Sequence, residues 1–196
     1  MSCHTLARHF ATALLLFVFT ATTQAAPTQV AGVTFTEQEH VGDAPLLLNG
    51  AGLRSKFFIK AYAIGLYLPH RASDANAAIA QAGPKRVRIV GLHDVNVSMF
   101  LSGLHGGFEK NLSRADLAAL QPRIDQFNAN LKAIGEIPKG ASFTIDLTAA
   151  DLTRISLDGK TAGQDIPGAD FYRALLRVWL GEKPAQDELK AALLGR

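Results

Sequence analysis

The spacing of apolar residues predicts strands and helices that are grouped along the chain. Strands are predicted where apolar and polar residues alternate, or where short apolar runs are bounded by turn residues. The strand candidates are residues 33–41, 45–48, 49–68, 85–93, 142–149 and 152–163. A turn is predicted at Asn49-Gly50 and Gly52, and a second, tight turn at Asp158-Gly159.

Helices are predicted where apolar residues recur at three- and four-residue spacing. The helix candidates are residues 73–83 with Ser73 as N-cap, 97–108, 113–134, 166–181 and 183–195. Strands and helices do not alternate regularly, so the sequence predicts an α+β fold with an antiparallel β-sheet and α-helices packed on one face. The length of 196 residues fits one folded domain.

The first 25 residues have the features of a secretory signal peptide. Arg8 is their only strongly charged side chain, a short apolar run follows it, and small residues precede a cleavage site after Ala25. The apolar run is about half of the roughly 20 residues that a helix needs to span a bilayer. We therefore predict a signal peptide at 1–25, a mature domain at 26–196, periplasmic or secreted localisation, and no integral membrane segment after cleavage.

The composition of the mature chain excludes several kinds of site. Cleavage would leave 171 residues without cysteine, with 19 basic and 17 acidic side chains. Disulfides, thiolate metal sites and cysteine nucleophiles are then impossible. The remaining histidines, at positions 40, 70, 93 and 105, lack metal-ligand spacing, so no metal site is expected. Scattered cations argue against nucleic acid as a partner, and the missing third glycine after Gly50-Ala51-Gly52 argues against a dinucleotide cofactor.

The stretch NGAGLRSKFFIKAYAIGLYL combines cations with an apolar strand pattern. If it forms one extended strand, Arg54, Lys56, Lys60 and Tyr62 point to the same face, because side chains two residues apart do so. One interpretation is the solvent-facing side of an antiparallel sheet. The other is a ligand site, because the same face becomes apolar and suits a ligand with a carboxylate head and an apolar body. The pattern alone does not choose between them.

Two stretches of the sequence resemble the chalcone isomerase family. GAGLR, followed by KFFIKAYAIGLYL, is similar to a family segment with G-A-G-V-R, K-F and A-I-G-V-Y-L in the same order. IPGADFYRALLRVWLG and the trailing KPAQDELKAALLG are similar to the family's C-terminal helices. The greatest similarity is to exported bacterial chalcone isomerase-like proteins, over nearly all of the mature chain. The resemblance implies the chalcone isomerase-like fold, which serves isomerases, fatty-acid binders and non-catalytic proteins.

The resemblance implies only part of the plant enzymes' site. Arg54 matches the arginine that engages the substrate in those enzymes and holds the carboxylate in the fatty-acid binders. Tyr62 stands where the plant enzymes have a threonine that positions a catalytic water. Met99 and Phe100 stand where the active-site tyrosine is expected, and Tyr172 aligns with a serine or threonine. Of the plant site, only the arginine is unchanged.

Met99, Gly103 and Gly107 form one stripe on the predicted helix 97–108, because they are four residues apart. An asparagine of the plant site aligns near Gly107. Each glycine costs a helix about 1 kcal/mol relative to alanine. Glycines at 103, 106 and 107 therefore indicate that another part of the protein or a ligand comes close to the helix backbone there. Close packing of the helix on its neighbours is one interpretation. A channel beside Met99 for an acyl or aromatic body, with its head at Arg54, is the other.

Three functions follow from these observations. The first is binding of a small amphipathic carboxylate, such as a fatty acid, or of a phenolic ligand. The residues predicted to contact it are Arg54, Tyr62, Lys60, Lys56, Met99, Phe100 and Tyr172. The second is an isomerase (intramolecular lyase) activity on a chalcone-like substrate, which the missing phenol at 99–100 disfavours, and the third is a non-catalytic scaffold. Trp179, the only tryptophan, is predicted to lie in the core.

Overall fold

The computed structural model describes residues 27–56 and 59–196. The predicted signal peptide at 1–25 and the tip of the segment 49–68, at Phe57 and Phe58, lie outside the described residues. None of the helices in the described part of the chain is long and apolar enough to cross a membrane.

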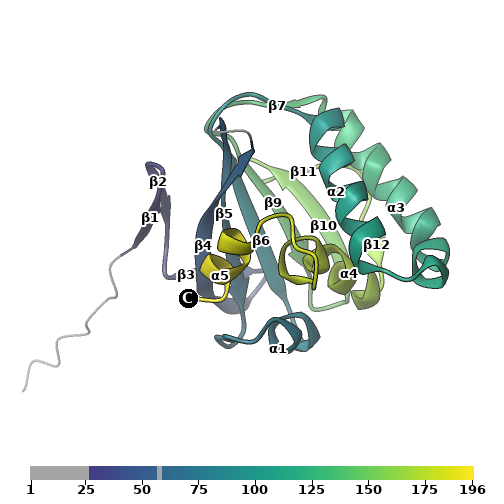
Figure 1. Cartoon of the computed structure of the whole chain (residues 1–196), viewed down its shortest axis with the longest axis horizontal. Helices are drawn as coiled ribbons and strands as arrows, with labels where there is room; N and C mark the ends of the chain where they lie inside the picture. The colour runs from purple at the N-terminus through teal and green to yellow at the C-terminus, as the bar shows by residue number, and fades with distance from the viewer. Residues whose placement is uncertain (1–26, 57–58) are drawn as a thin grey trace, which may run out of the picture.

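An antiparallel sheet forms the centre of the fold, with helices against one face (Figure 1). Its strand order is β11-β10-β9-β6-β5-β4-β3, and β12 pairs with β10. The bounds are β3 (Gln38–Val41), β4 (Ala44–Lys56), β5 (Ile59–Leu68), β6 (Lys85–Gly91), β9 (Ser142–Leu147), β10 (Leu152–Leu157), β11 (Lys160–Thr161) and β12 (Ile166–Pro167). Two small sheets pair β1 (Thr28–Val30) with β2 (Val33–Phe35), and β7 (Val95–Asn96) with β8 (Glu136–Ile137). The predicted α+β architecture is confirmed.

The helices are α1 (Ala75–Ala80), α2 (Val97–Asn111), α3 (Arg114–Ile134), α4 (Ala169–Leu180) and α5 (Asp187–Leu193). Side-chain caps fix where the middle helices start: Asn96 Oδ1 accepts the backbone N–H of Ser98 at 2.9 Å, and Ser113 Oγ accepts that of Asp116 at 3.0 Å. The predicted cap of the first helix was wrong by one residue, because Asp74 rather than Ser73 accepts the N–H of Ala77, at 2.8 Å.

The main core lies between the helices and the sheet. Phe171, Leu175, Val178 and Trp179 of α4 are buried in it, together with Phe108 of α2. Trp179 is 1% exposed, which confirms its predicted place in the core. Because α4 is buried on most of its circumference, it acts as the central helix on which α2 and the sheet both pack.

A second, smaller core lies on the other face of the sheet. Phe35 of β2 is fully buried there against Tyr67 and Ala63, and the backbone of Gly65 leaves room for its ring, because a Cβ at Gly65 would stand 2.6 Å from it. The predicted single strand at 33–41 is therefore wrong. The chain breaks after Phe35, so that β2 lies over this face with β1 while β3 joins the edge of the main sheet.

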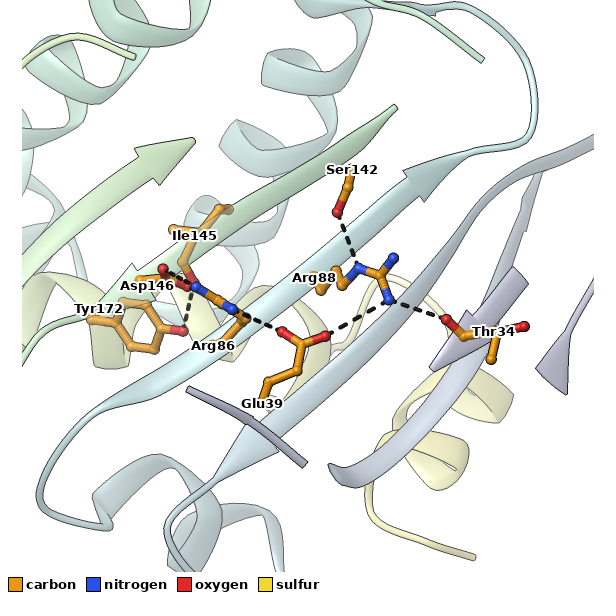
Figure 2. Close-up of polar contacts among 8 residues, drawn as sticks. All are labelled: Thr34, Glu39, Arg86, Arg88, Ser142, Ile145, Asp146 and Tyr172. Carbon is orange, nitrogen blue, oxygen red and sulfur yellow. Dashed lines mark hydrogen bonds and ion pairs between the residues drawn. The ribbon is translucent and has the colours of Figure 1, made fainter. Parts of the chain in front are cut away.

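An ion network ties this outer face together (Figure 2). Arg86 donates two hydrogen bonds to Asp146, Nε to Oδ1 and Nη2 to Oδ2, both 2.7 Å long, and a third of 2.8 Å to Glu39. Arg88 donates to Ser142 Oγ at 3.0 Å and to the Thr34 carbonyl at 3.1 Å. The network thus joins β6 and β9 in the middle of the sheet to β3 and the β1–β2 hairpin.

The turn predicted at Asn49-Gly50 and Gly52 was wrong, because strand β4 continues through these residues, with a register shift between Leu48 and Gly50. The glycines are needed for the close approach of α5. A Cβ at Gly50 would lie 2.1 Å from the Ala192 carbonyl oxygen, and a Cβ at Gly52 would lie 2.7 Å from Leu189 Cδ1. Asn49 is buried and uses its side chain as a connector, since its Nδ2 donates to the carbonyls of Ala72 and Leu193.

Candidate functional site

The predicted strand 49–68 is two antiparallel strands, β4 and β5, so its cations do not share a face through simple alternation. The pairing register nevertheless places Arg54 of β4 directly opposite Tyr62 of β5. A register irregularity follows at Ser55, which pairs with Lys60. Arg54 and Tyr62 therefore lie together because of the register between two paired strands, and not because they are an even number of residues apart in one strand.

A cavity of about 680 Å³ lies between this hairpin and helix α2. Such a volume is within the usual range for small-molecule sites, roughly 300–1,000 Å³. Its apolar wall consists of Ile59, Ala61, Phe100, Leu104, Val178 and Ala185. Its polar residues are Arg54, Tyr62, His93, Asp94, Asn96 and Ser102. The cavity is therefore largely apolar with a few polar groups, and among its described lining residues Arg54 is the only arginine or lysine.

Arg54 is half-buried, and a residue at the start of α5 hydrogen-bonds to its side chain. Its Nη1 donates to the Ser55 carbonyl at 2.7 Å and to Gln186 Oε1 at 3.3 Å, and the same Gln186 oxygen accepts the Ser55 N–H at 3.1 Å. Gln186 is the N-cap residue of α5, so the packing of α5 on β4 positions the guanidinium. Among the described residues, no carboxylate forms an ion pair with Arg54, which leaves its charge for an anion.

Tyr62 is 9% exposed and forms part of the cavity floor. Burial raises the pKa of its hydroxyl above the ordinary value, while the hydrogen bond from Trp179 and the charge of Arg54 oppose that rise. The hydroxyl is therefore neutral near neutral pH. Its oxygen accepts from Trp179 Nε1 at 3.1 Å, and within the described chain no group accepts its hydrogen. Tyr62 can thus donate to a ligand oxygen beside Arg54.

The mouth of the cavity carries exposed apolar side chains. Ile59 is 60% exposed and Met99 is 75% exposed, and these are the large apolar side chains that stand out to solvent in the described part of the chain. Both line the cavity, Ile59 from β5 and Met99 from α2. Exposed apolar residues at the mouth of a cavity are typical of a site that receives an apolar group.

The predicted site residues fall into three groups. Arg54, Tyr62, Met99 and Phe100 all line the cavity, and the Phe100 ring packs edge-on against Tyr62 with 6.1 Å between the ring centroids. Lys60 is exposed on β5 and is not part of the lining, and the Lys56 side chain lies outside the described residues.

Tyr172 forms the third group, because it lies in the core of the sheet away from this cavity. It is fully buried, and its hydroxyl donates to the Ile145 carbonyl at 3.0 Å (Figure 2). Burial raises the pKa of this hydroxyl well above the ordinary value. Its buried position on α4 and its hydrogen bond to the Ile145 carbonyl indicate a structural role.

The glycines of α2 have different environments. A Cβ at Gly107 would lie 2.7 Å from Val178 of α4, so this glycine allows the two helices to pack closely. Gly103 lines the cavity and is exposed, and apart from its adjacent residues and the local backbone of α2 no atom of the described chain lies within 4 Å of the position of a Cβ there. The packing interpretation therefore holds for Gly107, whereas Gly103 borders open space.

Several residues of the cavity were missed by the sequence analysis. His93, Asp94, Val95 and Asn96 come from the loop and short strand that lead from β6 to α2. They lack a motif, and the usable signal is their position after a strand that neighbours β5. Gln186 was missed because its contact with Arg54 spans 132 residues. No group of three potential metal ligands occurs in residues 27–56 and 59–196.

A second concavity, of about 600 Å³, lies among the ends of α1, α2, α4 and α5. Its lining is mainly polar and carries both signs of charge, with Lys110 and Arg177 accompanied by Asp74 and Glu182. This second concavity mixes opposite charges and has few apolar lining residues. The Arg54 cavity is therefore the better candidate for an amphipathic ligand.

Comparison with known proteins agrees with this fold. A family model described as chalcone isomerase-like matches residues 27–195. The chain belongs to the chalcone isomerase-like family. Among solved structures, a fatty-acid binding protein of Arabidopsis thaliana matches with a TM-score of 0.62 and 18% sequence identity, over 83% of this chain and 92% of that chain. No curated protein sequence matched.

The resemblance proposed from sequence is thereby confirmed at the level of family and fold. Membership of the chalcone isomerase-like family accounts for the curled antiparallel sheet with its helices on one face. It does not fix an activity, because one fold serves several functions.

Proposed function

We propose that this chalcone isomerase-like protein binds a small amphipathic carboxylate, such as a fatty acid, in the cavity between the β4–β5 hairpin and α2. The carboxylate head lies at Arg54 and Tyr62, and the apolar body lies against Phe100, Leu104 and Val178. The observation that carries the proposal is the half-buried Arg54, which has no carboxylate partner among the described residues and opens into an apolar cavity.

The chemistry of the two head-group residues supports this choice. A guanidinium grips a carboxylate with two parallel hydrogen bonds and remains charged at any pH near neutrality. The neutral Tyr62 hydroxyl adds a third donor at the same end of the cavity. The structural similarity to a fatty-acid binding protein also supports a carboxylate with an apolar body. The loaded protein is proposed to act outside the cytoplasm, after cleavage near Ala25.

Arg54→Ala is expected to weaken dodecanoate binding by about 1.5–3 kcal/mol, the range for hydrogen bonds to a charged group. This corresponds to roughly ten- to hundredfold in the dissociation constant. Titration calorimetry of the wild-type and variant proteins measures the change, and thermal melting checks that the variant remains folded.

Lys60→Ala is the matched control, because Lys60 is an exposed cation on the same hairpin. Its affinity for dodecanoate should stay within about twofold of wild type, since an exposed ammonium remains hydrated. An Arg54→Ala protein that binds dodecanoate as well as wild type would remove the proposed site. Equal losses in both variants would indicate attraction to the net charge alone.

An isomerase activity on a chalcone is the second candidate, in which Arg54 and the Tyr62 hydroxyl would contact the reacting oxygen atoms of the substrate. Met99 and Phe100 supply no phenol. We therefore expect no cyclisation of a chalcone above the spontaneous rate in an absorbance assay. Cyclisation that disappears in Arg54→Ala would favour the isomerase over the binder.

A further inference from the structure

Gly103 is the one glycine of α2 that both lines the Arg54 cavity and borders open space. It follows Met99 by one helical turn, so the two residues occupy the same side of α2. Met99 stands at the mouth, and Leu104, the residue after Gly103, belongs to the apolar wall. The missing side chain at 103 therefore leaves a gap in the wall that α2 contributes.

Close packing does not account for this glycine. At Gly107 a Cβ would meet Val178, whereas at Gly103, apart from the adjacent residues and the local backbone of α2, no atom of the described chain lies within 4 Å of the position of a Cβ. The φ angle of Gly103 is not among the positive values found in this chain, so alanine or leucine would fit its helical backbone. Alanine and leucine both have a higher helix propensity than glycine, and yet position 103 is glycine.

We propose that Gly103 determines the bulk of the ligand body that the cavity admits. A side chain at 103 would project into the space beside Met99 and Leu104 and occupy part of the cavity. A single acyl chain needs less of that space than a broad ring system, so the two should respond differently to a small side chain. This inference rests on the proposed binding of amphipathic carboxylates at Arg54.

Gly106 provides a matched control on the same helix. Outside the adjacent residues and the local backbone of α2, it also has no atom of the described chain within 4 Å of a Cβ position, so a Cβ meets no obstacle there, and it does not line the cavity. Equal substitutions at 103 and 106 raise helix propensity by the same amount. A difference between the two series therefore reports the cavity and not the stability of α2.

The experiment compares Gly103→Ala, Gly103→Leu, Gly106→Ala and Gly106→Leu by titration with two carboxylates, dodecanoate and pyrenebutanoate. Gly103→Ala should keep dodecanoate affinity within about twofold and weaken pyrenebutanoate more, and Gly103→Leu should weaken both by about tenfold or more, the effect of losing about two methylene contacts. Both Gly106 variants should bind like wild type.

Four results would overturn the inference. If Gly103→Leu binds both ligands like wild type, or if the two series weaken binding equally, residue 103 does not set ligand bulk, while an Arg54-dependent wild-type affinity leaves the proposed function intact. If wild-type protein binds neither carboxylate, or binds them independently of Arg54, the proposed function fails and the inference fails with it.

Discussion

Replacement of Arg86 by methionine is expected to lower the free energy of unfolding by about 3–5 kcal/mol, the usual cost of removing one partner from a buried ion pair. Arg86 is the only donor that joins Asp146 to Glu39 in the network of Figure 2. The Asp146 side chain is 8% exposed and that of Glu39 is 15% exposed. The variant would leave both carboxylates largely desolvated and without their strongest partner. Urea denaturation at neutral pH measures the loss.

The pH dependence of that loss has a definite sign. In the wild type, burial already raises the pKa of Asp146, and the hydrogen bonds and charge of Arg86 oppose the rise. Without Arg86 the pKa of Asp146 rises further above its unfolded value. The folded variant then binds more protons than the unfolded chain between those two pKa values, so its stability falls as pH rises through that window. The deficit of Arg86→Met relative to wild type should therefore shrink on acidification.

Arg154→Met is the matched control for this prediction. Arg154 also makes two hydrogen bonds to one carboxylate, that of Asp165, but its side chain is 45% exposed. Removal of an exposed pair costs about 1 kcal/mol or less. Similar losses in the two variants, or a deficit in Arg86→Met that grows on acidification, would contradict the role given to burial.

Trp179→Ala is expected to cost about 3–5 kcal/mol, because it removes a large side chain from a packed core and leaves a cavity. Trp179 is 1% exposed, and its Nε1 also donates to the Tyr62 hydroxyl. Thermal or urea unfolding measures the loss. An unchanged melting temperature would show that the core has no need of this ring.

Trp179→Phe separates packing from the hydrogen bond. It keeps an aromatic ring and removes the donor that holds the Tyr62 oxygen. We expect a smaller loss of stability than in Trp179→Ala, with a measurable decrease in dodecanoate affinity because Tyr62 is less well oriented. Wild-type affinity in Trp179→Phe would indicate that the hydroxyl keeps its position without Trp179.

Local sequence patterns correctly predicted individual helices and turns. The apolar stripe at Leu120, Ile124, Phe127 and Leu131 predicted α3, and all four side chains are buried. The dipeptide Asp158-Gly159 predicted a tight turn, and both residues have positive φ angles between β10 and β11. These signals succeed because the determining contacts lie within one element or one turn.

The errors come from contacts between distant parts of the chain. Gly50 and Gly52 are typical turn residues, but they remain in strand β4 because α5, some 140 residues later, packs directly on them. Nothing local distinguishes a glycine that makes a turn from one that admits a helix. The same reasoning explains Phe35 of β2, whose burial depends on Gly65 of β5, a strand of the main sheet to which β2 does not belong.

The central residue of the candidate site was predictable from the sequence, but most of the residues that surround it were not. Arg54 was identified from the family resemblance, whereas its pairing with Tyr62 depends on the register of two strands. The hydrogen bonds from Arg54 to Gln186 and from Trp179 to Tyr62 join residues more than 100 positions apart. Tyr172 was placed in the site because it aligns with a polar residue, and its hydrogen bond to Ile145 gives it a structural place instead.

A crystal structure of the protein with dodecanoate would show whether Arg54 and Tyr62 bind the carboxylate head. We expect the carboxylate to lie at about 2.7–3.2 Å from the Arg54 guanidinium and the Tyr62 hydroxyl, with the acyl chain against Phe100 and Leu104. Dodecanoate bound with its carboxylate away from Arg54, for example in the polar concavity beside Lys110 and Arg177, would contradict it.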